Sequence, residues 1–287
     1  MKLYTIDTEL FKLDGGAMFG VVPKSIWQKL NPADDNNLCT WAMRLLLIED
    51  EGRLILVDTG IGNKQDAKFF GHYYLHGNDT LDKSLAKHGF HRDDITDVIL
   101  THLHFDHCGG AIIREGDRLL PAFKNAQYWS NAQHWDWAVH PNDREKASFL
   151  KDNILPIQQS GQLAFITMPQ PAKDRLPQAP FSENISLRFV SGHTNSMMLP
   201  QINYKGKTIV YMADLLPSAG HIPLPYVMAY DMFPLTTLGE KKMFLEEALA
   251  NDYILFFEHD PKWECCTLEQ TEKGIRMKEA FALSTLG

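Results

Sequence analysis

The chain has 287 residues, of which 44% are hydrophobic, and it carries a formal net charge of −8 at pH 7. This length and composition can fill a substantial core, and they exclude a disordered chain. The acidic balance, with a pI near 5.8, disfavours nucleic acid and anionic membranes as partners.

The amino-terminal sequence MKLYTIDTELFKLDGG has acids where a signal peptide needs an unbroken apolar run. The longest apolar runs, such as LILV, are too short to cross a bilayer. We therefore expect a soluble, cytoplasmic protein. Its four cysteines form no C-x-x-C pair, and the last two are adjacent, so reduced thiols are expected at Cys39, Cys108, Cys265 and Cys266.

Strand-like and helix-like segments alternate along the first half of the chain. The apolar segments 41–48 and 53–57 flank the turn-prone residues EDEG and predict a hairpin. Asn78 or Asp79 can cap a helix that runs to about His88, with Gly89 as its stop. Residues 97–100 (DVIL) predict a buried strand that leads into THLHFDHCGG, residues 101–110.

Residues 129–154 are predicted to be helical with a break at Pro141, and the proline-rich residues 169–180 predict a connector. Beyond the connector, three apolar strands are expected, each followed by a polar side chain: residues 187–190, 208–212 and 254–257.

Two S/T-x-x-E/Q patterns, at 237–240 and 267–270, predict helix starts. The first pattern precedes residues at the spacing of one apolar helix face, namely Phe244, Leu245, Ala248 and Leu249. Strands combined with amphipathic helices predict an α/β class.

The segment THLHFDHCGG concentrates four metal-binding side chains within six positions: His102, His104, Asp106 and His107. In an extended segment His102 and His104 point the same way, so both can reach one ion, whereas the next two follow a turn. This spacing suits two ions better than one, and these residue types bind zinc. The alternative is a hydrogen-bonded core histidine followed by a solvated loop.

The pattern H-x-H-x-D-H after a strand resembles the signature of the metallo-β-lactamase fold hydrolases. Other family landmarks stand in the expected order: Asp58 in VDTG, His193 in SGHT, Asp214 after TIVYMA and His259 after ILFFE. The resemblance covers nearly the whole chain, and it is greatest to the dinuclear branch that includes N-acyl-homoserine lactonases and methyl parathion hydrolase. It implies a four-layer αββα sandwich as a single domain over residues 1–287, with pseudo-symmetric halves at about 1–168 and 181–287.

The resemblance also implies a ligand set for two metal ions. One ion would be held by His102, His104 and His193, the other by Asp106, His107 and His259, and Asp214 would bridge both. Asp58 is expected to orient a histidine ligand rather than to serve only as a turn former. Zinc is the expected metal, with manganese, iron or cobalt as alternatives because histidine and aspartate suit them all.

Two ions that share a carboxylate and a water lower the pKa of that water to about neutrality, so hydroxide becomes available as a nucleophile. The expected function is therefore a metal-dependent hydrolase of small-molecule lactones or related esters, without nucleic-acid or membrane partners. Organophosphate, phosphoester and glyoxalase-type thioester hydrolysis are alternatives. A diiron oxidoreductase is less expected, because those relatives carry glutamate in place of His104. A metal-stabilised, nonenzymatic module is disfavoured, because structural zinc sites are closed and commonly rich in cysteine.

The chain departs from the best-known lactonases at Pro217, where they carry a tyrosine three residues after the bridging aspartate. His221, Tyr226 and Tyr230 are candidates for the missing polar group, although each also fits a packing or surface role. Asp214 or another carboxylate can protonate the leaving group. The predicted catalytic residues are Asp214, His221 and Tyr230.

Several apolar residues near these motifs have two interpretations. Cys108 is expected to pack beneath the site rather than to bind metal. A methionine and aromatic set either lines an apolar pocket or belongs to the core: Phe105, Met197, Met198, Met228 and Phe233. The tryptophans at 129, 135 and 137 fit a homodimer interface or buried packing equally well.

Overall fold

A computed structural model describes residues 1–170 and 174–287. The chain divides into two compact units, the first made of Met1–Glu9 with Met43–Thr167 and the second of Leu10–Ala42 with Met168–Gly287. The predicted connector 169–180 follows directly after this boundary, and its residues 171–173 lie outside the described residues. The expected single domain with two pseudo-symmetric halves stays a prediction. The sequence pattern did not indicate that residues 10–42 belong with the second unit.

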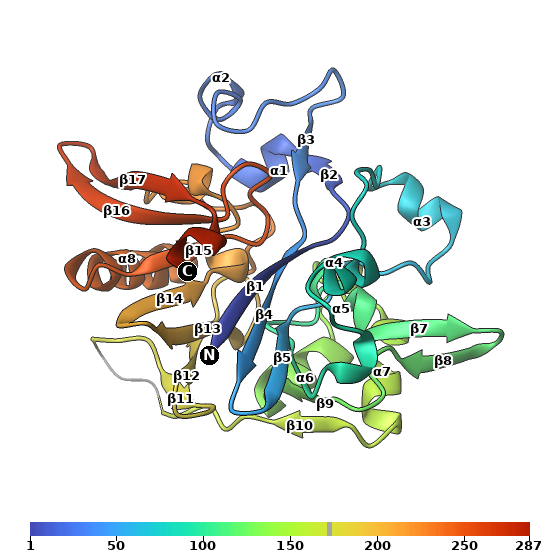
Figure 1. Ribbon diagram of the computed structural model, residues 1–287. Coiled ribbons are helices and arrows are strands. Elements are labelled where there is room, and N and C mark those ends of the chain that lie inside the picture. Colours follow the sequence, from blue (N-terminus) through green and yellow to red (C-terminus); the bar gives the residue numbers. More distant parts are fainter. Residues whose placement is uncertain (171–173) are drawn as a thin grey trace. The chain divides into compact units, whose positions relative to one another are not determined.

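The first unit is built on one six-stranded mixed sheet, drawn from blue to yellow-green in Figure 1. Its order is β1 (Lys2–Asp7), β4 (Arg44–Asp50), β5 (Arg53–Val57), β6 (Asp97–Ile99), β9 (Gln127–Ser130) and β10 (Leu163–Phe165). The first three strands pair antiparallel, which confirms the predicted hairpin, and the last four run parallel. The hairpin strand begins at Arg44 because Trp41 ends a different strand, β3 (Leu38–Trp41).

Short helices and one hairpin complete the first unit. They are α3 (Ala67–Gly71), α4 (Leu81–Lys87), η1 (Arg92–Asp94), α5 (Phe105–Cys108), η2 (Gly109–Ala111), β7 (Ile112–Glu115), β8 (Arg118–Pro121), α6 (Ala132–Val139) and α7 (Lys151–Gln159). Helix α4 contacts β1, and α7 contacts β7 and β8. Between these elements lies a core whose members include Leu47, Leu56, Leu85, Val98 and Ile157, all fully buried. The alternation of strands with apolar helix faces therefore produces the expected core.

Two local predictions for the first unit need correction. The cap of α4 is Thr80, whose hydroxyl accepts from Lys83 N, rather than Asn78 or Asp79. The predicted stop at Gly89 is confirmed by its left-handed backbone, with a φ of +81°. Trp129 lies in β9 instead of a helix, because residues 127–130 pair with both β6 and β10.

The tryptophan-rich middle is packed and hydrogen-bonded within the first unit. Trp129 Nε1 donates to Asp97 at 2.8 Å, and Trp137 Nε1 donates to Glu145 at 2.7 Å. Trp135 is buried. These contacts support buried packing, and a homodimer stays an untested prediction.

The second unit is built on a seven-stranded sheet, yellow to red in Figure 1. Its order is β11 (Gln178–Pro180), β12 (Ile185–Val190), β13 (Met197–Tyr204), β14 (Lys207–Tyr211), β15 (Ile254–Phe256), β16 (Cys265–Thr271) and β17 (Gly274–Phe281). Only β14 and β15 pair parallel. The three strands predicted after the connector correspond to β12, β14 and β15.

The remaining elements of the second unit include a small hairpin and several helices. They are β2 (Phe11–Asp14) paired with β3, α1 (Gly15–Phe19), α2 (Lys24–Trp27), η3 (Ala213–Leu215), η4 (Ala219–His221), α8 (Pro234–Ala250) and η5 (Leu283–Leu286). Helix α8 lies beside the sheet and contacts β16 and β17 (Figure 1). Among the described residues, no helix has both the length and the apolar composition needed to cross a bilayer.

Both predicted capping boxes are wrong. Helix α8 begins at Pro234, whose missing N–H costs nothing in the first turn, so Thr237 already lies inside the helix. Residues 267–270 belong to β16, because pairing with β17 outweighs a local helix signal. The apolar face is confirmed at Phe244, Leu245 and Ala248, which are buried, whereas Leu249 is half-buried.

We expect Leu255→Ala to lower the free energy of unfolding by about 2–5 kcal/mol, because Leu255 on β15 is fully buried and its truncation leaves a cavity. Leu235→Ala is the matched control, since Leu235 is 84% exposed and its truncation should change stability by less than about 0.5 kcal/mol. Urea unfolding followed by circular dichroism measures both. Equal losses in the two variants would contradict this assignment of the core.

Candidate metal centre

Three neighbouring parallel strands of the first unit end at one edge of its sheet and place polar residues there. Asp58 follows β5, the H-x-H-x-D-H motif follows β6, and Asn131 begins the helix after β9. Asp58 N donates to Ile99 O at 2.9 Å, which locks the first two strand ends together. Because parallel strands bring their carboxyl ends to the same edge, residues far apart in sequence meet there.

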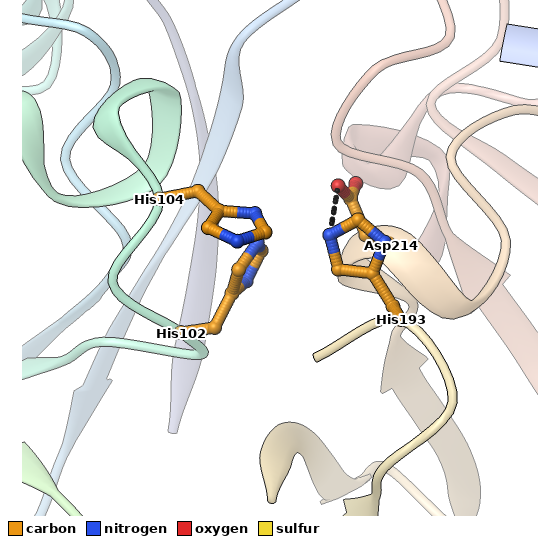
Figure 2. Close-up of side chains that lie close together, drawn as sticks. All are labelled: His102, His104, His193 and Asp214. Carbon is orange, nitrogen blue, oxygen red and sulfur yellow. Dashed lines mark ion pairs between the residues drawn. The ribbon is translucent and has the colours of Figure 1, made fainter. Parts of the chain in front are cut away.

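The four side chains of the motif are buried and lie close together. The rings of His102 and His104 have centroids 4.6 Å apart, and those of His102 and His107 are 3.9 Å apart. Figure 2 shows the His102 and His104 rings lying next to each other. A ring nitrogen of His102 lies within 4.8 Å of one of His104, and Asp106 offers an oxygen within the same distance of a nitrogen of His107. The four side chains therefore form one buried cluster, and their division between two ions stays a prediction.

Hydrogen bonds decide which nitrogen of each imidazole can bind an ion. The Thr101 hydroxyl donates to Asp58 at 2.6 Å, so it accepts from His102 Nδ1 at 3.1 Å. Asp58 also accepts from His107 Nδ1 at 3.2 Å. Both rings are thereby held in the tautomer that carries its lone pair on Nε2. Asp58 thus has the orienting contacts that the sequence predicted for it.

His104 is oriented the opposite way by a residue that the sequence interpretation missed. Its Nε2 lies 3.0 Å from Glu145, so its lone pair is on Nδ1. Glu145 is 1% exposed and is itself held by Trp137 Nε1 and by Asn142 Nδ2 at 3.1 Å. The sequence did not indicate this role, because no recognisable motif surrounds Glu145 and its partner His104 is distant in the chain.

A second missed residue holds the backbone of the motif. His134 Nε2 accepts from Leu103 N at 2.9 Å, while His134 N donates to the Asn131 side chain at 2.8 Å. His134 is completely buried. The start of α6 therefore fixes the chain between the first two histidines of the motif.

Close backbone packing and strain shape the other end of the motif. Thr59 donates to His107 O through its N–H at 2.7 Å and through its hydroxyl at 2.9 Å. A Cβ at Gly109 would lie 2.1 Å from Ile61 O, so only glycine allows this approach. Asp58 itself has a φ of +58°, a strained conformation for a non-glycine residue that its carboxylate contacts stabilise.

The second unit brings its candidate ligands together in the same way, at the ends of neighbouring strands. Strands β12 and β14 run in the same direction because β13 pairs antiparallel with both, and β15 is parallel to β14. Their carboxyl ends therefore lie along one edge and present His193, Asp214 and His259, all buried. The prediction that three apolar strands each deliver a polar residue is confirmed.

The Asp214 carboxylate lies between the two histidines of this unit. One oxygen is 3.1 Å from His193 Nε2, an ion pair drawn in Figure 2, and the other is 3.2 Å from His259 Nε2. Ala213, directly before it, has a strained φ of +40°. A carboxylate with one oxygen towards each imidazole has the arrangement that a bridging ligand requires.

The far nitrogens of these two imidazoles are also held. His193 Nδ1 lies 2.9 Å from Asp231, and His259 Nδ1 donates to Ala42 O at 2.7 Å. Burial by itself lowers the pKa of His193, but Asp214 and Asp231 outweigh it and raise the pKa to about 10. Two carboxylates around one buried imidazole therefore favour a cation at this position, either a proton or a metal.

The donor set fits divalent metal ions. In both units, buried imidazoles and carboxylates offer nitrogen and oxygen donors, and each imidazole has its other nitrogen held by an oxygen atom. This pattern of outer hydrogen bonds is the one that metal-binding histidines require.

Two other candidates have different surroundings. His221 has Nδ1 2.9 Å from Ser218 Oγ and Nε2 2.9 Å from Met18 O, and its ring stacks on Phe19. Burial lowers the pKa of His221 to about 3. These contacts give His221 a packing role, and its catalytic role stays a prediction. Tyr230 is 38% exposed.

The predicted apolar set divides between core and surface. Met197 and Met198 on β13 are fully buried, and Met228 is 4% exposed, as expected of core residues. Phe233 is 45% exposed, whereas Phe105 packs against Tyr73 with ring centroids 4.6 Å apart. The core interpretation therefore holds for the three methionines.

We expect Glu145→Gln to weaken zinc binding by roughly tenfold, because an amide holds the His104 tautomer less firmly than a carboxylate does. Asp143→Asn is the control, since the Asp143 side chain is 99% exposed. Competition with a chromophoric chelator measures both affinities. An unchanged zinc affinity in the Glu145 variant would contradict the orienting role of Glu145.

Cys108 should be neither a ligand nor a reactive thiol. It is fully buried, its thiol donates to Leu103 O, and burial raises its pKa to about 12. We expect iodoacetamide at pH 8 to leave Cys108 unmodified in the folded protein, and Cys108→Ala to keep the metal content. Mass spectrometry and elemental analysis test these outcomes, and metal loss in a folded variant would refute the packing role.

Comparison with known proteins places this geometry in a family. The metallo-beta-lactamase superfamily matches residues 45–259, which include all the residues proposed as ligands. Among curated proteins, the N-acyl homoserine lactonase AiiA of Bacillus thuringiensis subsp. kurstaki is 28% identical over 142 residues, covering 46% of this chain and 50% of the relative. The chain thus matches about half the length of the curated relatives.

Solved structures resemble the chain over a larger share of its length. A protein from Staphylococcus aureus, described as "a probable metal-dependent hydrolase", has a TM-score of 0.86 at 25% identity, covering 98% of this chain and 96% of that one. AidC, a dizinc quorum-quenching lactonase, has a TM-score of 0.77 at 21% identity, covering 98% and 95%, and therefore supports the fold alone. The predicted α/β fold class is confirmed by these likenesses. With its family match over residues 45–259, the chain belongs to the metallo-beta-lactamase superfamily.

Proposed function

We propose that this chain is a metal-dependent hydrolase that opens lactones or cleaves closely related esters. The single observation that carries the proposal is the Asp214 carboxylate, whose two oxygens face His193 and His259. Structural zinc sites seldom use such a carboxylate, whereas hydrolases that bind two ions do.

The ligand assignment that the sequence resemblance implies is part of this proposal. His102, His104 and His193 would hold one ion, while Asp106, His107 and His259 would hold the other, and Asp214 would contact both. Zinc is the favoured metal, and manganese, iron or cobalt would suit the same donors.

The bound ions would supply an activated water and polarise the carbonyl group of the substrate. Side chains of the protein would support that chemistry by fixing which nitrogen of each imidazole carries the proton. Asp58, Asp231 and Glu145 keep one nitrogen of a neighbouring imidazole protonated. The other nitrogen of each ring therefore keeps the lone pair that can bind a metal ion. Asp214 is the candidate to give a proton to the leaving alkoxide once the ring opens.

The substrate class is supported by the relatives. The curated relatives that match this chain over about half of their length are named as N-acyl homoserine lactonases. Pro217 stands where the best-known lactonases carry tyrosine, so another side chain would have to stabilise the developing negative charge. Tyr230 is the candidate, because it is partly exposed and adjacent to Asp231, which contacts His193.

Metal removal and substrate choice test this proposal together. We expect chelator-treated protein to lose hydrolysis of N-acyl-homoserine lactones, and zinc or manganese to restore it. Paraoxon, a glutathione thioester and a phosphodiester should be turned over at least about tenfold more slowly than the best lactone. A pH-stat assay that detects the released acid measures lactone and thioester turnover.

Asp214→Asn should lower kcat by a factor of about a hundred or more, because an amide can neither serve as an anionic bridge nor deliver a proton. Asp252→Asn is the control on an exposed turn of the same unit. Fully metal-loaded protein that leaves every lactone intact would refute the lactonase proposal. Preference for the thioester or paraoxon would reassign the substrate class.

A further inference from the structure

We propose that Glu240 and Lys241, adjacent residues on α8, are positioning residues that hold His193 and the segment 223–231 in their binding geometry. The inference rests on the proposed function only in taking His193 as a metal ligand. All of the contacts that carry it lie within the second unit.

Glu240 holds the loop that carries His193. One carboxylate oxygen accepts from Ser191 N at 2.7 Å and the other accepts from Gly192 N at 2.9 Å. These two amides directly precede His193, where the loop leaves β12 and has no strand partner. A carboxylate that binds two consecutive backbone amides fixes the direction in which the next side chain points.

The start of α8 holds the same loop from a second side. Phe233 N donates to Gly192 O at 2.8 Å, and Met232 N donates to His193 O at 3.0 Å. A Cβ at Gly192 would lie 2.3 Å from Thr237 N, so the loop and the first turn of the helix touch through their backbones. Since Asp231 also contacts His193 Nδ1, the helix and its preceding residues bind this loop at residues 191–193.

Lys241 holds the other segment that meets His193. Its ammonium donates to Pro223 O at 2.9 Å and to Tyr226 O at 2.8 Å, and the residue is 1% exposed. The segment then continues through Tyr230 to Asp231, the orienting partner of His193. Lys241 therefore acts on the same imidazole as Glu240, through Asp231 rather than through the backbone.

Neither residue is what an ordinary helix position would carry. Burial raises the pKa of Glu240 to about 7 and lowers the pKa of Lys241 to about 7, which reflects the cost of placing charges away from water. The next lysine, Lys242, instead has a 61% exposed side chain and pairs with Glu246, whose side chain is equally exposed. Apolar residues would stabilise α8 against the sheet at lower cost, so the buried Lys241 and the half-buried Glu240 point to a positioning role.

The test compares Glu240→Gln and Lys241→Met with Lys242→Met and Glu246→Gln as matched controls on the same helix. Zinc affinity is measured by competition with a chromophoric chelator, and amide hydrogen exchange is followed in the metal-free proteins. We expect one of the two zinc-binding steps to weaken by roughly tenfold in each buried-site variant, as for the loss of other outer hydrogen bonds around metal ligands. The exposed controls should bind zinc as the unchanged protein does.

Hydrogen exchange separates positioning from general destabilisation. In Glu240→Gln, exchange should quicken at the Ser191 and Gly192 amides while the amides of β14 keep their protection. Unchanged affinity in both buried-site variants, or equal losses in the exposed controls, would overturn the proposal. If Lys241→Met does not fold, Glu240→Gln decides the outcome alone. Neither readout needs a substrate, so a failure of the lactonase proposal would leave this test intact.

Discussion

The site of this protein depends on hydrogen bonds that hold one nitrogen of every candidate metal-binding imidazole. Oxygen atoms of Thr101, Asp58, Glu145, Asp231 and Ala42 hold the outer nitrogens of His102, His107, His104, His193 and His259 respectively. A free imidazole exchanges tautomers and rotates, and each motion removes its lone pair from an ion. These outer contacts convert a group of histidines into a set of directed donors.

Strand direction makes those contacts available. In each unit the polar residues follow strands whose carboxyl ends lie at one edge, β5, β6 and β9 in the first unit and β12, β14 and β15 in the second. The strands are short and apolar, so burial fixes their register and leaves the following residues to turn towards the edge. The strained backbones of Asp58 and Ala213 occur at these turns, where surrounding contacts offset the cost.

The second unit adds a further layer of support behind its outer contacts. Asp231 orients His193, and residues of α8 hold both the loop of His193 and the segment that leads to Asp231. A buried charge is costly unless its partners satisfy it, and Glu240 and Lys241 are each satisfied by two backbone groups. In the proposed enzyme, the precision of a ligand would therefore depend on residues that never touch an ion.

The sequence by itself predicted the candidate metal ligands and most of the strands that carry them. The spacing of His102, His104, Asp106 and His107 predicted two pairs of donors, and short apolar runs predicted β12, β14 and β15, because side-chain periodicity is a local property. Only the tertiary structure decided that Glu145, 41 residues from His104, and Asp231, 38 residues from His193, orient those rings. The helix starts predicted at 237 and 267 are wrong in the structure. Helix α8 begins earlier, at Pro234, and residues 267–270 pair with β17 as part of β16. Residues that are distant in sequence and meet only in the folded protein cannot be predicted from periodicity, because their contact depends on how distant segments pack.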